Sequence, residues 1–570
     1  MRSACGHASQ WPGNAAAKRQ RQFALGAGPR LPRWGPRVGP QRQCKKDGQD
    51  GQEEMVLRPC ASAVTQTIAR APAGLEACAT AVTGAVVLVI MFVLQAFPPS
   101  LRFGEARLSA ERGGGRPALA QQNPNLAANF VKIDAPVLAL THARVIDGTG
   151  APARDDQTVI VRDGSIAAIG NAATVTVPEG ATTIDLTGRT IVPGLVMMHE
   201  HLYYTTGPGV YGQLGASFSR LYLAGGVTTM RTGGNVNGIM DINLARRIAA
   251  GELPGPDIDA TAPYVNGPSA FLQMHALRNA DEARRHVAYW ADQGATSVKA
   301  YMQISRDALR AAIDEAHKRG MKVTGHLCSV TYAEAADAGI DDLEHGFFAS
   351  TDFVPDKQPD VCPTQGRGQQ TIASLDPNGE PFKALVRKLV DKRVALTSTL
   401  TVFETLTPKR PLPPGLDVLA PQLDQAFRRA YDRAQQNEQS VYATLFSKGM
   451  ALERAYAKAG GLLIAGTDPT GAGGVVPGFA DQRQIELLVE AGFTPIEAIA
   501  IGTHNGAKYL GRDARTGSIA VGKQADLVVV AGDPSKAIGD IRRVETVFKR
   551  GVGYDPAKLI ESVKGLVGIW

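Results

Sequence analysis

Between residues 194 and 511, short apolar runs alternate with stretches of helical periodicity, and this alternation limits the possible folds more than any other feature. Helical stretches with an apolar stripe include Arg306–Arg319 and Tyr332–Ala338. Strands that alternate with helices form parallel sheets, and eight such units predict a closed (β/α)₈ barrel, the TIM barrel. The eight runs that we expect to be strands are Gly194–Met198, Val227–Arg231, Ile258–Ala262, Ser297–Tyr301, Lys322–Gly325, Asp341–Glu344, Val394–Ser398 and Leu462–Gly466.

Short strands with Gly and Asp turns flank this region on both sides. Residues 137–193 contain runs such as Val137–Ile146, and residues 512–556 return to the same pattern at Ala525–Val530. This texture is typical of a small β unit. We therefore predict an α/β chain in which a discontinuous β-sandwich, built from both segments, accompanies a barrel at 194–511.

Residues 1–130 are rich in Arg, Gly, Pro and Gln and predict a largely disordered leader. Within it, an apolar segment at about 79–97 fits a signal peptide or a single membrane anchor, because basic residues precede it and it is just long enough to span. Either reading predicts an exported protein, periplasmic or membrane-anchored. Met55 is an alternative translation start that keeps the apolar segment. If the leader is a misassigned start, the protein would be cytoplasmic.

The formal net charge of +7 comes from basic residues that crowd into this leader, as in Arg42–Lys46. A nucleic-acid-binding protein would carry a basic patch on a folded face together with a reading motif. Neither is evident, so we expect no nucleic-acid partner.

Cysteine usage leaves one question open. Of the six cysteines, only Cys328 and Cys362 lie in the region of globular patterning, which is too few for a disulfide framework. One disulfide between them and two buried free thiols both fit the sequence.

Polar groups suited to metal binding occur at the ends of five predicted strands. The first strand runs into His199 and His201, and residues two apart in an extended chain face the same side, so both imidazoles can reach one cation. The C-terminal ends of barrel strands converge on one face, where active sites lie. Imidazole and carboxylate together suit zinc or a similar first-row metal. The complete candidate set is His199, His201, Lys299, His326, His345 and Asp468.

With these residues in this order, the chain resembles the amidohydrolase superfamily, in its binuclear branch with a lysine on strand four. The imidazolonepropionase-like and Xaa-Pro-dipeptidase-like members are the most similar, over roughly residues 137–556, which include Gly502–Gly511 after the last strand. The resemblance implies two divalent metal ions, with Zn²⁺ preferred. In the implied arrangement the first ion is held by His199, His201 and Asp468, the second by His326 and His345, and a carboxylated Lys299 bridges them.

The resemblance also implies a metal-dependent hydrolase that cleaves a C–N amide or peptide-like bond in a dipeptide, an N-acyl amino acid or a cyclic amide. A metal-bridging hydroxide would attack, and Asp468 would act as general base and then as general acid. Tyr301, two residues beyond Lys299, would donate to the developing oxyanion, although a tyrosine that packs in the barrel wall fits equally well. His275, in the loop after the third strand, would contact substrate.

Other functions remain compatible with parts of this pattern. A hydrolytic deaminase of the same superfamily would lack the strand-four lysine and carry a Glu shortly after His326, whereas Leu327–Val330 contains none. A lactonase or esterase would need the same metal chemistry. A non-catalytic metal-binding barrel would be expected to have lost ligands. We expect a small-molecule or dipeptide substrate, and both membrane association through the apolar segment and homo-oligomer formation stay open.

Overall fold

The computed structural model describes residues 126–568 except 208–209, 269–272 and 365. The predicted leader, including its apolar segment at about 79–97, lies outside the described residues apart from its last few positions. The described residues belong to one compact unit, Arg116–Trp570. Among them, no helix combines the length and apolar character that a membrane crossing requires.

Eight parallel strands occupy the positions predicted for the barrel. They pair in the orders β11-β10-β7 and β12-β13-β14-β15-β16. Their side chains are almost entirely buried, as expected for parallel strands covered by helices. Their bounds are β7 Leu195–Glu200, β10 Val227–Thr232, β11 Asp257–Asp259, β12 Ser297–Ala300, β13 Lys322–Gly325, β14 Asp342–Glu344, β15 Ala395–Ser398 and β16 Leu463–Ala465.

Two sets of contacts close these strands into a barrel. Parallel bridges from Thr261 to Ser297 and from Val265 to Ala300 connect the segment after β11 with β12. At the other seam, the backbone N–H groups of Thr467 and Asp468 donate to the carbonyl of His199, which joins the end of β16 to the end of β7. The third strand is shorter than the predicted Ile258–Ala262, because the chain leaves β10 after Asp259 to make the bridges to β12.

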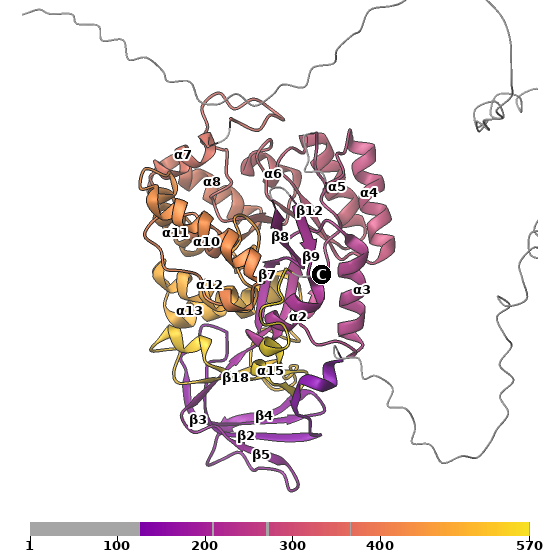
Figure 1. The fold of residues 1–570 in the computed structure, drawn as a ribbon, viewed down its shortest axis with the longest axis vertical. Helices are drawn as coiled ribbons and strands as arrows, with labels where there is room; N and C mark the ends of the chain where they lie inside the picture. The colour runs from indigo at the N-terminus through magenta and orange to yellow at the C-terminus, as the bar shows by residue number, and fades with distance from the viewer. Residues whose placement is uncertain (1–125, 208–209, 269–272, 365, 569–570) are drawn as a thin grey trace, which may run out of the picture. The chain divides into compact units, whose positions relative to one another are not determined.

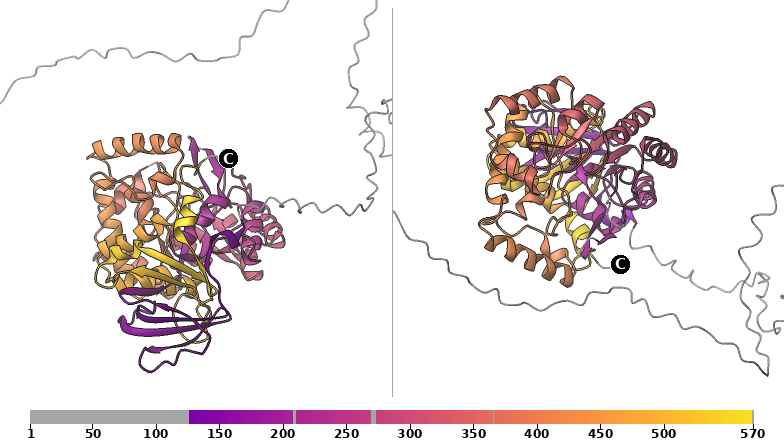
Figure 2. Two further views of the ribbon diagram at one scale, coloured as in Figure 1. Left: turned by 60° about the horizontal axis from the view of Figure 1, so that its bottom comes forward. Right: turned by 90° about the horizontal axis from the view of Figure 1, so that it is seen from above.

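Helices surround the barrel, as Figures 1 and 2 show. Helix α5 illustrates why they form, since Ser305 caps its first turn and the face that includes Leu309, Ile313 and Ala316 is buried. The α-helices of the described residues are α2 Gly215–Ala224, α3 Gly238–Ala249, α4 Ala280–Gln293, α5 Arg306–Lys318, α6 Tyr332–Ala338, α7 Arg367–Ala373, α8 Glu380–Asp391, α9 Leu400–Glu404, α10 Pro421–Gln436, α11 Tyr442–Lys458, α12 Phe479–Glu490, α13 Pro495–Ala500, α14 Gly506–Tyr509 and α15 Pro556–Glu561. A two-stranded hairpin, β8 Tyr203–Gly207 and β9 Val210–Gln213, follows the first barrel strand.

Strands from both ends of the described chain pair in one nine-stranded sheet, and Figure 1 shows the indigo and yellow segments side by side. Strands β17 and β6 are antiparallel neighbours, with Leu527 opposite Pro193. Leu138, Val159 and Phe548 are buried in the core of this sheet. The strands are β1 Val131–Ile133, β2 Val137–Val145, β3 Arg154–Arg162, β4 Ser165–Asn171, β5 Thr182–Asp185, β6 Arg189–Pro193, β17 Leu527–Ala531, β18 Val544–Lys549 and β19 Val552–Tyr554.

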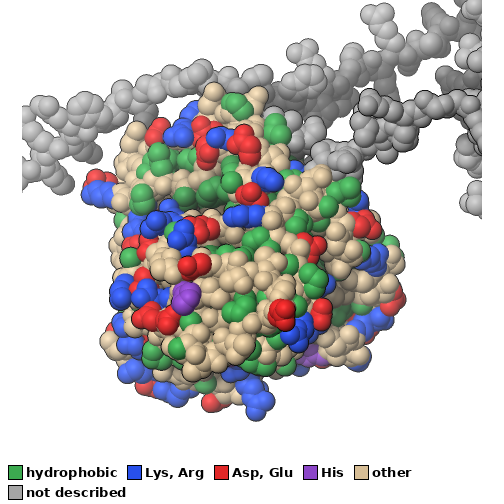
Figure 3. All heavy atoms as spheres, turned by 90° about the horizontal axis from the view of Figure 1, so that it is seen from below, with side chains coloured by type: hydrophobic (Ala, Val, Ile, Leu, Met, Phe, Trp, Pro, Cys, Tyr) green, Lys and Arg blue, Asp and Glu red, His purple; other side chains and the backbone are tan. Residues whose placement is uncertain are grey.

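Two further features of the fold concern its surface charge and its cysteines. On the face drawn in Figure 3, basic and acidic side chains are interspersed over the described surface. Cys328 and Cys362 form a disulfide that links the segment after β13 to the loop before α7. Of the two states that the sequence left open, the structure has the disulfide.

Candidate metal centre

The six side chains proposed as metal ligands line a single cavity of about 220 Å³ at the C-terminal ends of the barrel strands. They come from β7, β12 and the residues that follow β7, β13, β14 and β16. All are buried or nearly so. Residues far apart in the chain are thus brought together at the mouth of the barrel, where the alternation of strands and helices predicts a site.

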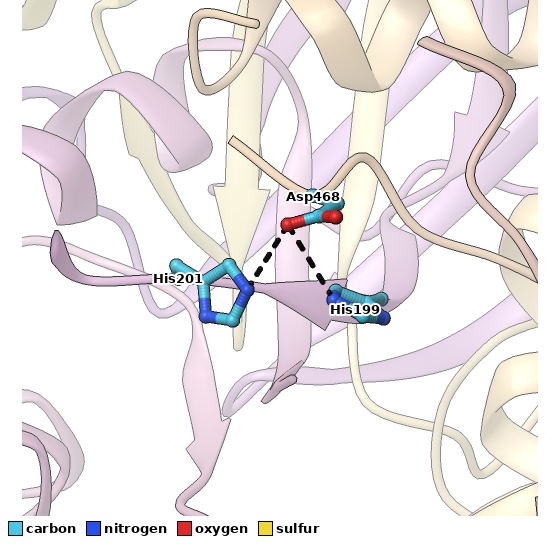
Figure 4. Close-up of side chains that lie close together, drawn as sticks. All are labelled: His199, His201 and Asp468. Atoms are coloured by element: carbon cyan, nitrogen blue, oxygen red, sulfur yellow. Dashed lines mark ion pairs between the residues drawn. The ribbon is translucent and has the colours of Figure 1, made fainter. Parts of the chain in front are cut away.

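His199, His201 and Asp468 form the tightest group. One oxygen of Asp468 lies 3.2 Å from Nε2 of His201 and 3.6 Å from Nε2 of His199. Figure 4 shows this oxygen pointing toward both imidazoles. One donor atom from each of the three residues lies within 4.8 Å of the others, so a single cation could be coordinated by all three.

The remaining ligand candidates adjoin this group. The imidazole rings of His326 and His345 lie 4.4 Å apart between centroids, and the ring of His345 lies 4.7 Å from that of His199. The other oxygen of Asp468 is 3.8 Å from Nδ1 of His345. The arrangement therefore offers a second pair of imidazoles directly beside the first cluster.

Hydrogen bonds behind the imidazoles fix their orientation. Nδ1 of His201 lies 3.1 Å from the carbonyl oxygen of Gly234, and Nδ1 of His345 lies 2.8 Å from the hydroxyl of Thr399. Because a carbonyl can only accept, Nδ1 of His201 carries the proton and its Nε2 keeps a lone pair toward the cavity. This is the tautomer that a metal ligand needs.

A buried charge network, which the sequence analysis did not identify, supports the site from inside the barrel. Glu344 accepts a hydrogen bond from Nδ1 of His199, and its other oxygen lies 3.3 Å from Nζ of Lys299 and 3.0 Å from Arg231. Arg231 also contacts Asp342 at 2.7 Å. The sequence does hold a signal for this network, because two acids and an arginine inside buried strands require partners.

Burial lowers the pKa of three imidazoles, those of His201, His326 and His345, whereas Glu344 and Asp468 raise the pKa of His199 against the effect of burial. Burial, with the nearby Lys299, lowers the pKa of His326 to about 3, so this imidazole is neutral. Burial would raise the pKa of Asp468, but the imidazoles of His199 and His201 hold it well below its usual range. The pKa of Lys299 is lowered by burial, against the opposing effect of Glu344. Neutral imidazoles and an ionised carboxylate fit a divalent cation of the zinc type.

Local backbone geometry makes room for the cluster. His345 and Asp468 have φ values of 67° and 55°, a left-handed region that costs energy for residues other than glycine and is enriched at functional sites. A Cβ at Gly233 would clash with the ring of His199, and one at Gly466 would clash with its backbone. The close approach of β10 and β16 to His199 therefore requires glycine at both positions.

The two further residues predicted to contact substrate differ in position. Tyr301 lines the cavity, with its ring 5.0 Å from both His326 and Tyr264. His275 is exposed, stacks at 6.3 Å on His286, and is not among the residues that line the cavity. Gln273 and Met274 of the same loop line it, so substrate contact by His275 stays a prediction.

A comparison of sequence families decides the identity of the barrel. Residues 190–553 match the profile of the Amidohydrolase family, more than half of the chain. The chain belongs to the amidohydrolase family. The resemblance to the amidohydrolase superfamily seen in the sequence is confirmed, and with it the expectation of an α/β fold that contains a TIM barrel.

Individual relatives support the same family. Enamidase from Eubacterium barkeri is 24% identical over 422 residues, 70% of this chain and 90% of the enamidase. An uncharacterised protein from Mycobacterium bovis is 26% identical over 253 residues, 44% of this chain. The match spans about half, 53%, of that mycobacterial relative.

Solved structures agree with the fold. A provisionally assigned prolidase from Bifidobacterium longum superposes with a TM-score of 0.56 at 26% identity, covering 75% of this chain and 98% of that one. A Xaa-Pro dipeptidase with methionine bound in its active site gives a TM-score of 0.56 at 19% identity, covering 74% and 100%.

Proposed function

We propose that this amidohydrolase hydrolyses a C–N amide or peptide-like bond in a small molecule, using two divalent ions, preferably Zn²⁺. The observation that carries the proposal is the convergence of six metal-suited side chains on one cavity. The similarity to enamidase and to prolidase-like structures supports a bond of this kind. A lactone or other ester would need the same chemistry and is the main alternative, followed by deamination and by metal binding without catalysis.

In this proposal His199, His201 and Asp468 would hold one ion, and His326 and His345 would hold the other. A carboxylated Lys299 would contribute to both. Support for carboxylation comes from Nζ of Lys299, which is buried and makes no hydrogen bond within the described residues, although Glu344 is 3.3 Å away. A buried ammonium in that state is costly, and carboxylation replaces it with an anion suited to two cations. The bound ions would supply an acidic water and polarise the scissile carbonyl.

The chain's own residues would move the protons. Asp468 is held ionised beside the imidazoles, so it can accept a proton from the attacking water and deliver it to the leaving nitrogen. Burial raises the pKa of Tyr301, so its hydroxyl stays protonated and can donate to the oxyanion that develops on the carbonyl.

Location outside the cytoplasm, in the periplasm or on a membrane, is part of the proposal. The disulfide between Cys328 and Cys362 supports it, because disulfides persist in oxidising compartments. Cell fractionation tests membrane association through the apolar segment. Light scattering tests assembly into homo-oligomers.

Metal quantification and a substrate screen test the proposed reaction. The purified chain should hold about two zinc ions and hydrolyse members of a panel of dipeptides, N-acyl amino acids, cyclic amides and lactones. Asp468→Asn should abolish turnover while metal content stays near two per chain. Asp424→Asn, which alters a surface carboxylate paired with Arg428 on α10, is the control. Substantial activity in Asp468→Asn would refute the proton transfer.

A further inference from the structure

The charged groups that line the cavity all belong to the metal site. Apart from the histidines they are Lys299 and Asp468, and no other acid, lysine or arginine of the described residues lines it. The nearby Arg231 points instead to Asp342 and Glu344. The undescribed positions 269–272 are Ser, Ala, Phe and Leu, and positions 208–209 are Pro and Gly, so these short gaps contain no charged residue either.

Aromatic rings form much of the remaining cavity wall. Tyr203 stacks on the ligand candidate His201 at 4.4 Å, and Tyr211 lies 5.2 Å from Tyr203. The ring of Phe403 lies 5.9 Å from that of His345. Aromatic side chains therefore stand beside ligand candidates for both proposed ions, and Val402 and Met274 add further apolar surface.

These two observations select between substrates. A free carboxylate on the substrate would lose its hydration on entering, and no cationic side chain outside the metal site would replace it. A flat apolar group would bury its faces against the rings, which favour offset and edge-to-face contacts. The desolvation cost of a carboxylate and the ring contacts of an apolar group both favour an uncharged, apolar substrate.

We propose that the cavity takes an uncharged substrate with an aromatic or other flat apolar group beside the scissile bond, and discriminates against a free carboxylate carried anywhere within it. This inference rests on the proposed hydrolase function and narrows it. Among the candidate substrates, it favours neutral and cyclic amides over N-acyl amino acids and dipeptides with a free carboxyl end.

Binding of matched hydroxamates tests the inference without requiring turnover. Benzohydroxamate and 4-carboxybenzohydroxamate share the same metal-binding group and differ only in one remote carboxylate, and acetohydroxamate lacks the ring. With the zinc-loaded full chain in a calorimeter, benzohydroxamate should bind about tenfold more tightly than either of the others. Phe403→Leu should weaken benzohydroxamate binding by about three- to tenfold and leave acetohydroxamate unchanged.

Each other outcome contradicts the inference in a recognisable way. Equal or tighter binding of the carboxylated compound overturns it, as does failure of all three probes to bind a chain that holds two zinc ions. If the chain hydrolyses amides but prefers carboxylated ones, the substrate inference is wrong and the hydrolase function stands. If the chain holds no zinc, the proposed function is wrong and the inference falls with it.

Discussion

The carboxylate of Glu344 accepts a hydrogen bond from Nδ1 of His199, which leaves Nε2 of that imidazole 3.6 Å from Asp468. The second oxygen of Glu344 lies 3.3 Å from Nζ of Lys299. Glu344 is completely buried, so no bulk water can replace either contact. One side chain that coordinates nothing thus positions two proposed ligands.

Glu344→Gln tests this positioning. An amide binds the Nδ1 proton of His199 more weakly than a carboxylate does, so zinc affinity should fall by about 10- to 100-fold. Competition with a chromogenic chelator measures the change. Glu453→Gln is the matched control, because Glu453 is also a buried acid but bonds to Ser398 instead of a proposed ligand. Wild-type zinc affinity in Glu344→Gln would refute the positioning role.

Lys299→Met tests the proposed bridge between the ions. Methionine fills a similar volume in the buried strand but cannot be carboxylated, so metal content should drop from two ions per chain to one or fewer. Turnover should fall by about a thousandfold, which corresponds to about 4 kcal/mol in activation free energy. Elemental analysis of the variant and intact-mass measurement of a carboxyl adduct on the native wild type check both parts. Two tightly held ions in Lys299→Met would exclude a bridging lysine.

The barrel could be predicted because its strands are buried on both faces and therefore read as apolar runs. Lys322–Gly325 was predicted with its observed bounds. The predicted third strand, Ile258–Ala262, begins one residue later and ends three residues later than the observed Asp257–Asp259. In the structure Asp259 is buried in the strand, where it accepts from Ser297 and pairs with Arg512 at 3.2 Å. Partners from distant segments offset the cost of burying that charge, and local sequence does not reveal them.

The ligand candidates could be predicted from their places at strand ends, since parallel strands bring those ends together regardless of loop structure. The cavity walls could not. Tyr203, Tyr264 and Phe403 lie in segments after strands, and their directions depend on how those segments pack. For the same reason the sequence did not single out Gln273 and Met274, which line the cavity from the loop of His275.

The disulfide between Cys328 and Cys362 should stabilise the loop beside His326. It joins residues 34 apart, and restricting the unfolded chain over such a loop contributes about 4 kcal/mol. The double variant Cys328→Ser/Cys362→Ser should therefore unfold at lower denaturant concentration than the wild type. Reductant should lower the denaturant concentration at which the wild type unfolds to that of the variant, and it should leave the value for the variant unchanged. If reductant lowered the unfolding concentration of both proteins equally, its effect would not come from the Cys328–Cys362 disulfide.

Asp241, in the first turn of α3, should make stability depend on pH. The residue is completely buried, and neither carboxylate oxygen has a hydrogen-bond partner within the described residues. Burial raises the pKa of this carboxyl to about 8, whereas in the unfolded chain it is about 4. Between these values the folded protein binds more protons than the unfolded chain, so the stability contributed by Asp241 is present below pH about 4 and is lost as pH rises toward 8.

Asp241→Asn removes this dependence, because an amide does not titrate in the range. As pH rises from 5 to 8, the free energy of unfolding of the variant should increase relative to that of the wild type, by an amount on the order of a few kcal/mol. Calorimetric melting of the metal-free proteins at several pH values measures the difference. The unpaired amide of the variant adds an offset that does not vary with pH, so the slope carries the result. A difference between the two proteins that stays constant from pH 5 to 8 would mean that Asp241 has an ordinary pKa in the folded state.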